Sequence, residues 1–135
     1  MADEEFTYAI EVEAQYRDID SNGHVNQAVY ASWFEQARSK YWGEVIGIRH
    51  DRAPVALVKQ EIEYRRPIGL DESVTIHQRI DPLGETSIPF TYEARVDDDR
   101  AATADVVLLS FDREAMEAAP IPEAWREPIE DFEGH

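Results

Sequence analysis

One segment of the sequence, residues 27–46, has the spacing of a long helix that must be buried. Its apolar side chains recur at steps of three and four residues, so they lie along one face of about five helical turns. These residues are Tyr30, Trp33, Phe34, Ala37, Tyr41 and Val45. Asn26 is a candidate N-cap, because its side-chain oxygen can accept from the free N–H groups of the first turn. Gly47 suits a left-handed C-cap. A stripe this wide requires other elements to cover it.

Five further segments have the composition and alternation of strands. The apolar and polar residues of residues 6–16 alternate without a break, which predicts a strand with one buried face. The remaining strand segments are residues 55–66, 74–80, 88–96 and 101–111. The order is therefore strand, long helix and four consecutive strands. This order indicates an α+β fold in which an antiparallel sheet wraps one helix.

Three local features qualify these strands and the end of the chain. In residues 55–66 the apolar positions change parity after Leu57, which predicts either a bulge or a strand covered on both faces. Pro89 predicts a bulge or an unpaired edge position. Residues 113–135 form an acidic tail with several prolines, for which we expect a short helix near residues 123–126 and a loosely held end.

The length of 135 residues predicts one domain, with its core in about residues 6–112. The sequence has no cysteine, which excludes disulfides, zinc–thiolate sites and cysteine nucleophiles. Residues 1–5 do not resemble a signal peptide, and no apolar run approaches the roughly 18 residues of a membrane span. These features predict a cytoplasmic protein.

The chain is strongly acidic, with 29 acidic and 13 basic residues and a formal net charge of −16. This balance argues against nucleic-acid partners, whose affinity comes from neutralised phosphates, and against anionic membranes. The acidic residues are spread along the whole chain, and only Lys40 and Lys59 are lysines. Such a surface suits a cytoplasm of concentrated salt, where charge repulsion is screened. The alternative is an ordinarily acidic mesophilic protein.

The loop before the long helix has a specific pattern, Asp18-x-Asp20-x-x-Gly23-His24-Val25-Asn26, followed by Tyr30 and by the run Trp33-Phe34-Glu35-x-Ala37-Arg38. Over about residues 6–112 the chain resembles the hotdog-fold acyl-CoA thioesterases of the 4-hydroxybenzoyl-CoA thioesterase type, and the related acyl-carrier-protein thioesterases. The resemblance implies a curled sheet of five to six antiparallel strands around a central helix. It also implies homodimers joined edge to edge, often paired into homotetramers, with active sites at the dimer interface and no metal or cofactor.

The same resemblance implies roles for four residues around the start of the helix. Asp20 matches the catalytic carboxylate, and Gln27 matches the position whose backbone N–H polarises the thioester carbonyl. His24 and Asn26 match a histidine and an asparagine that are catalytic in the acyl-carrier-protein type. A carboxylate beside a helix N-terminus can both activate the attack on a carbonyl and stabilise its oxyanion. From spacing alone, Asp20 could instead be a turn residue without a catalytic role, Asn26 could be the helix cap, and His24 could be a packing or hydrogen-bonding residue. Asp18 is expected to bond the loop or to balance Arg17.

Substrate contacts are predicted at a second group of residues. Coenzyme A carries phosphates, so an acidic protein needs a local basic patch to bind it. The leading candidates are Lys59, Arg65 and Arg66, with Arg49 and Arg52 behind them, and Tyr30 is a candidate for the acyl tunnel. A hotdog hydratase would need aspartate and histidine five residues apart, a spacing that is absent here. We therefore expect a thioesterase acting on acyl-CoA, or alternatively on acyl-carrier protein, and keep a non-catalytic acyl-CoA-binding domain as a further alternative.

Overall fold

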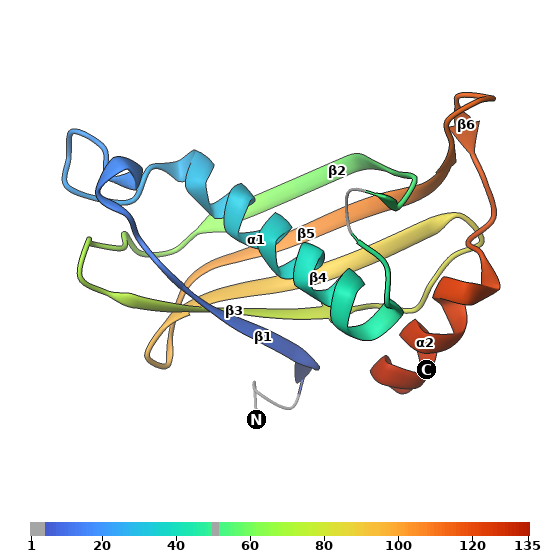
Figure 1. The fold of residues 1–135 in the computed structure, drawn as a ribbon. Helices are drawn as coiled ribbons and strands as arrows, with labels where there is room; N and C mark the ends of the chain where they lie inside the picture. The colour runs from blue at the N-terminus through green and yellow to red at the C-terminus, as the bar shows by residue number, and fades with distance from the viewer. Residues whose placement is uncertain (1–4, 50–51) are drawn as a thin grey trace.

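The computed structural model describes residues 5–49 and 52–135 and shows a curled antiparallel sheet that wraps one long helix (Figure 1). The six strands are β1 (Tyr8–Glu13), β2 (Val55–Tyr64), β3 (Ser73–Ile80), β4 (Ser87–Val96), β5 (Asp99–Asp112) and β6 (Glu117–Ala118). The strand order is β1-β3-β4-β5-β2, and β6 pairs with β5. The predicted α+β hotdog layout is therefore confirmed.

The central helix α1 (Gln27–Tyr41) continues into one π-helical turn (Trp42–Ile46), so the predicted helix has the expected length but a wider last turn. The side chain of Asn26 accepts a hydrogen bond of 2.9 Å from the N–H of Ala28, as expected of an N-cap. Gly47 ends the helix with φ of 90°, a left-handed conformation that favours glycine. Both helix ends lie where the sequence predicted them.

The core lies between α1 and the concave face of the sheet. Phe34 and Ala37 of α1 are fully buried, and Phe34 stacks on Tyr92 of β4 with ring centroids 4.7 Å apart. Tyr92 in turn stacks on Phe90 of the same strand. Because burying a large apolar side chain contributes about 1.5–3 kcal/mol, this aromatic layer holds the helix to the sheet.

Two strand irregularities bear on the predictions. The pairing of β2 with β5 shifts register between Leu57 and Lys59, so of the two predicted alternatives the bulge is confirmed. Pro89 is not at a bulge and β4 is not an edge strand, because Pro89 pairs with Val107 of β5. The ladder between β3 and β4 ends at Phe90, one residue away, so the N–H that proline lacks falls beyond the paired part of β3.

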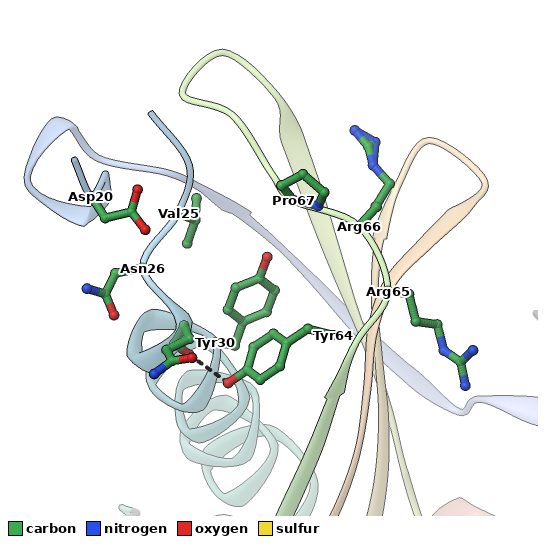
Figure 2. A pocket seen from close by; sticks show the side chains of 9 residues that line it. Asp20, Val25, Asn26, Tyr30, Tyr64, Arg65, Arg66 and Pro67 are labelled. Carbon is green, nitrogen blue, oxygen red and sulfur yellow. Dashed lines mark hydrogen bonds between the residues drawn. The ribbon is translucent and has the colours of Figure 1, made fainter. Parts of the chain in front are cut away.

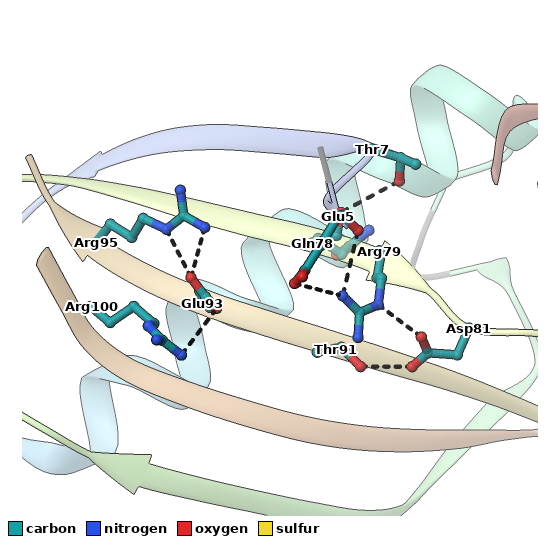
Figure 3. Close-up of polar contacts among 9 residues, drawn as sticks. All are labelled: Glu5, Thr7, Gln78, Arg79, Asp81, Thr91, Glu93, Arg95 and Arg100. Atoms are coloured by element: carbon teal, nitrogen blue, oxygen red, sulfur yellow. Dashed lines mark hydrogen bonds and ion pairs between the residues drawn. The ribbon is translucent and has the colours of Figure 1, made fainter. Parts of the chain in front are cut away.

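The convex face of the sheet carries ion pairs that join neighbouring strands (Figure 3). Glu93 lies between Arg95, at 2.7 Å, and Arg100, at 3.8 Å. Asp81 accepts hydrogen bonds from Arg79 and Thr91. Charged side chains on this face therefore have partners within the chain.

The end of the chain differs from its prediction as a loosely held tail. Helix α2 (Glu123–Glu133) buries Trp125 and Ile129, and Trp125 packs edge-on against Trp42 with centroids 5.2 Å apart. The prolines that suggested a loose end lie before this helix and within it, at Pro128. Burial of the two apolar side chains outweighs the cost of the internal proline. In the part of the chain that the structure describes, no helix is long and apolar enough to cross a membrane.

Candidate active site

The loop before α1 is a tight turn organised by the carboxylate of Asp20. Its Oδ1 accepts hydrogen bonds from the backbone N–H groups of Asn22, at 2.9 Å, and His24, at 3.3 Å. The backbone N–H of Asp20 donates to the C=O of His24, and Gly23 adopts a left-handed φ of 80°. No described residue donates a hydrogen bond to Oδ2 of Asp20. One oxygen of this carboxylate therefore shapes the loop, as the turn prediction required, and the other remains available.

The neighbouring Asp18 is structural, as expected, since its side chain accepts a 2.8 Å bond from the N–H of Gln15. The loop is also tied to the rest of the fold. The N–H of Val25 donates to the C=O of Ile68, in the segment that follows β2. These bonds place the loop against the end of β2.

The first turn of α1 has one N–H donor without an acceptor. The N–H of Ala28 donates to the side chain of Asn26, and that of Val29 donates to its C=O. Among the described residues, none accepts from the N–H of Gln27. An unpaired N–H at the positive end of a helix is suited to binding an oxyanion.

A pocket of about 450 Å³ lies where this helix terminus meets the end of β2 (Figure 2). Six residues that the sequence singled out line it: Asp20, Asn26, Gln27, Tyr30, Arg65 and Arg66. Figure 2 shows the Asp20 carboxylate on the loop side and the Arg65 and Arg66 side chains on the opposite side of the opening. The pocket thus combines a carboxylate, a free N–H donor and two guanidinium groups.

Two tyrosines form the wall of this pocket. Tyr30 is buried and packs edge-on against Tyr64, with ring centroids 5.0 Å apart. The hydroxyl of Tyr64 donates a 2.9 Å hydrogen bond to the C=O of Gln27. Burial raises the pKa of Tyr30, with a further contribution from Tyr64, and burial also raises the pKa of Tyr64. Both rings are therefore neutral at ordinary pH and present apolar surface beside the polar groups.

The two arginines differ in how strongly they are paired with acidic side chains. Arg66 pairs with Glu72 at 2.5 Å, and Glu72 also accepts from the N–H of Gly69. The hydrogen bond from the Gly69 N–H and, to a smaller extent, the pair with Arg66 hold the pKa of the Glu72 carboxyl below its usual range. Arg65 is more exposed, and among the described residues its guanidinium forms an ion pair only with Glu63, at 3.6 Å. Arg65 is the freer of the two to meet a phosphate.

Other residues named from the sequence lie outside the pocket lining. His24 is exposed in the loop, and its backbone rather than its ring contacts Asp20. Lys59, Arg49 and Arg52 are exposed and do not line the pocket. Their predicted roles stay predictions. Within residues 5–49 and 52–135, no three His, Asp or Glu side chains form a group that could hold a metal ion.

Tyr64, Val25 and Pro67 line the pocket and had no predicted site role. For Tyr64 a signal existed: it precedes Arg65-Arg66 and shares the apolar parity of the second half of β2. The alternation of a strand predicts only which face of the sheet a side chain lies on. It does not predict that the Tyr64 side chain reaches the start of α1.

The sequence and the fold of this chain are similar to those of known proteins. A family model described as the thioesterase-like superfamily matches residues 14–129, most of the chain. The chain belongs to the thioesterase-like superfamily. Membership confirms the predicted family and the prediction of a thioester hydrolase. The matched range includes the loop, α1 and the end of β2, which are the elements that form the pocket.

Individual proteins are also similar to this chain. A thioesterase from Thermus thermophilus, crystallised with coenzyme A and zinc, is 32% identical, with a TM-score of 0.89 and 98% of each chain covered. The acyl-CoA thioester hydrolase YbgC of Escherichia coli is 25% identical over 84% of this chain and 88% of its own. A 1,4-dihydroxy-2-naphthoyl-CoA thioesterase from Synechocystis, 17% identical with a TM-score of 0.84, covers 92% of this chain and 96% of its own and shares the fold.

Proposed function

We propose that this protein hydrolyses acyl-CoA thioesters to a free acid and coenzyme A in the pocket between the α1 terminus and the end of β2. The observation that carries the proposal is that Asp20 and Gln27 line one pocket, with an oxygen of Asp20 and the N–H of Gln27 both unpaired within the described chain. The relatives named above support acyl-CoA as the substrate class, because YbgC is an acyl-CoA thioester hydrolase and the Thermus structure contains coenzyme A.

Asp20 either activates a water molecule or supplies the attacking oxygen itself. As a general base it removes a proton from water, the resulting hydroxide attacks the thioester carbonyl, and the C–S bond breaks to release the coenzyme A thiolate, which takes up the proton from Asp20. As a nucleophile it attacks the carbonyl itself, expels the coenzyme A thiolate, which takes up a proton, and leaves a mixed anhydride that water cleaves. In both routes the carbonyl oxygen becomes negative, and the N–H of Gln27 stabilises that charge.

The remaining lining residues bind the two ends of the substrate. The rings of Tyr30 and Tyr64 supply apolar surface for the acyl group, as a pocket for a fatty or aromatic acid requires. Arg65 attracts the coenzyme A phosphates and offsets the negative field of the rest of the chain. Arg66, paired with Glu72, holds the segment that follows β2 in position.

The active assembly in this proposal is a homodimer joined along β2. That strand ends the sheet on one side, so one edge of its backbone has no neighbouring strand among the residues that the structure describes. It carries three exposed large apolar side chains, Leu57 at 51%, Val58 at 55% and Tyr64 at 48%. Since Tyr64 also lines the pocket, a partner that covers β2 would complete the wall of the site. The predicted tetramer and cytoplasmic location remain predictions.

The proposal is tested by following thiol release from a panel of acyl-CoAs of different length and aromaticity, alongside the matching acyl-carrier proteins. Asp20→Asn is the decisive variant, because an amide oxygen can still accept from Asn22 and His24 and keep the loop folded. We expect a rate loss of at least 100-fold with little change in melting temperature. Equal rates for wild type and folded Asp20→Asn would remove Asp20 from the mechanism, and release from carrier protein alone would reassign the substrate.

The two routes are distinguished by single turnovers in water labelled with heavy oxygen. If Asp20 is the nucleophile, heavy oxygen can enter the peptide that contains Asp20 when the anhydride is cleaved. If Asp20 is only a base, all of the label goes into the acid product.

A further inference from the structure

Two arginines of the described chain are almost fully buried, and they have opposite surroundings. Arg38 and Arg95 are each only 5% exposed. Arg95, on the convex face, pairs with Glu93 at 2.7 Å (Figure 3). Arg38 projects from α1 into the interior, and no Asp or Glu of the described residues forms an ion pair with it. Removing a charged group from water without a partner costs several kcal/mol, so this arginine requires an explanation.

The neighbours of Arg38 are neutral. Its Nη1 lies 3.3 Å from the hydroxyl oxygen of Tyr92, and its guanidinium carbon lies 5.9 Å and 6.0 Å from the ring centroids of Phe90 and Tyr92. The rings offset part of the cost through cation–π attraction. Tyr92 accepts from Arg38, so its own O–H can still donate a hydrogen bond. Burial raises the pKa of Tyr92, which keeps this hydroxyl neutral.

Further polar groups in the same interior also lack partners. Within the described chain, the buried side-chain atoms of α1, its π turn and the concave sheet face without a hydrogen bond are Nε of Arg38, Nε1 of Trp42, and Nε2 and Oε1 of Gln78. Trp42 follows Arg38 by four residues, and its backbone N–H donates to the Arg38 C=O, so the two side chains lie on one helix face. Gln78 is fully buried and faces Tyr92 across the ladder between β3 and β4.

These groups have a common character, since three of the four unpaired atoms are donors and the only charge among them is positive. A purely apolar core would have no hydrogen-bond donors at these positions, and an ordinary ion pair would include a carboxylate. A set made of a guanidinium, an indole N–H, a carboxamide and a phenol O–H matches an anion of low charge that tolerates aromatic neighbours. A halide fits this description better than a phosphate, which needs more positive charge than one guanidinium supplies.

We propose that a chloride or bromide ion binds between α1 and the concave face of the sheet, against Arg38, Trp42, Gln78 and Tyr92. The ion neutralises the buried guanidinium and accepts from the otherwise unpaired donors. It joins the middle of α1 to β3 and β4, so its binding stabilises the folded chain. The site is separate from the pocket at Asp20 and does not depend on the proposed hydrolysis.

The test is a chloride and bromide titration of the melting temperature at constant ionic strength, with sodium gluconate as the bulky replacement anion. For wild type we expect a saturating rise of roughly 5–10 °C once the halide exceeds its dissociation constant about 100-fold. For Arg38→Met we expect no saturating rise, and a melting temperature in gluconate equal to or above that of wild type, because an unpaired buried charge has been removed. Arg17→Met removes the same charge from an exposed position and should behave like wild type.

A second variant and a direct measurement keep the proposal falsifiable if Arg38→Met does not fold. Gln78→Met preserves the arginine and should shift the halide titration to higher concentration. Crystals soaked in bromide should show an anomalous peak within hydrogen-bonding distance of the Arg38 guanidinium. A halide response that is identical in wild type, Arg38→Met and Gln78→Met would overturn the proposal, as would bromide-soaked crystals with no such peak.

Discussion

At the scale of single residues, Asp20 shows how one carboxylate can have a structural and a chemical role. Its Oδ1 closes the turn through Asn22 and His24, while no described residue donates to Oδ2. The sequence left these two roles as alternatives. In the structure they use different oxygens and are therefore compatible. This is why Asp20→Asn, rather than Asp20→Ala, separates chemistry from folding.

The N–H of Gln27 can be removed with little disturbance to the helix. Proline is favoured at the first helical position, and the extended conformation of Asn26, with ψ of 137°, suits a residue before proline. We expect Gln27→Pro to lower kcat by about 100- to 1,000-fold, the effect of deleting one oxyanion donor, with a melting temperature close to that of wild type. Gln27→Ala keeps the N–H and should retain most activity. A fully active Gln27→Pro enzyme would contradict the oxyanion role.

At the scale of elements, the segment after β2 is held by an acid that the sequence did not single out. Glu72 accepts from the Gly69 N–H at 2.9 Å and pairs with Arg66, so it shapes the edge of the pocket. These contacts favour the ionised carboxyl and lower its pKa. Stability from a lowered pKa is present above the ordinary value and is lost as pH falls through the folded value.

Glu72→Gln should therefore lower the melting temperature at pH 7, by a small amount because the pair is partly exposed. The difference from wild type should shrink as pH falls below about 4.5, the ordinary value for this carboxyl. Melting curves between pH 3 and pH 7 measure this difference in melting temperature. Glu63→Gln, which removes an exposed carboxyl, is the control. A difference independent of pH would show that ionisation of Glu72 is not its source.

Helix α2 is a structural part of the domain. Trp125 packs against Trp42, at the π turn that ends α1, and Tyr41 donates a 2.7 Å hydrogen bond to Glu133 of α2. We expect Trp125→Ala to lower the free energy of unfolding by about 3–5 kcal/mol, the usual cost of truncating a buried tryptophan. Denaturant titration measures this value. Trp125→Phe should recover much of the loss, and a Trp125→Ala protein as stable as wild type would mean that α2 does not support the core.

At the scale of the whole molecule, the concave face of the sheet is filled by α1 and the convex face carries paired charges, which leaves β2 as the apolar free edge. The net charge of −16 opposes association in dilute buffer, and salt reduces that repulsion. Contacts along β2 therefore have to be apolar and hydrogen-bonded to the backbone if two chains are to join there.

Val58→Lys tests this edge without changing the core, since Val58 is 55% exposed. We expect the variant to sediment as a monomer and to lose most thioesterase activity, because Tyr64 of the same strand lines the pocket. Met116→Lys adds the same charge at a position that is 72% exposed and outside β2, and should leave both properties unchanged. A dimeric Val58→Lys protein would place the subunit contact elsewhere.

Local patterns in the sequence determined the helix stripe, the caps at Asn26 and Gly47 and the fold class, and offered the bulge after Leu57 as one of two alternatives. Each depends on residues a few positions apart, where side-chain spacing follows directly from helix and strand geometry. Only the tertiary structure brought Tyr64 to the C=O of Gln27, 37 positions away, and docked α2 on the end of α1. The same is true of Arg38, whose isolation in the core depends on which strands cover the helix, because a buried charge is paired or unpaired only through its neighbours in space.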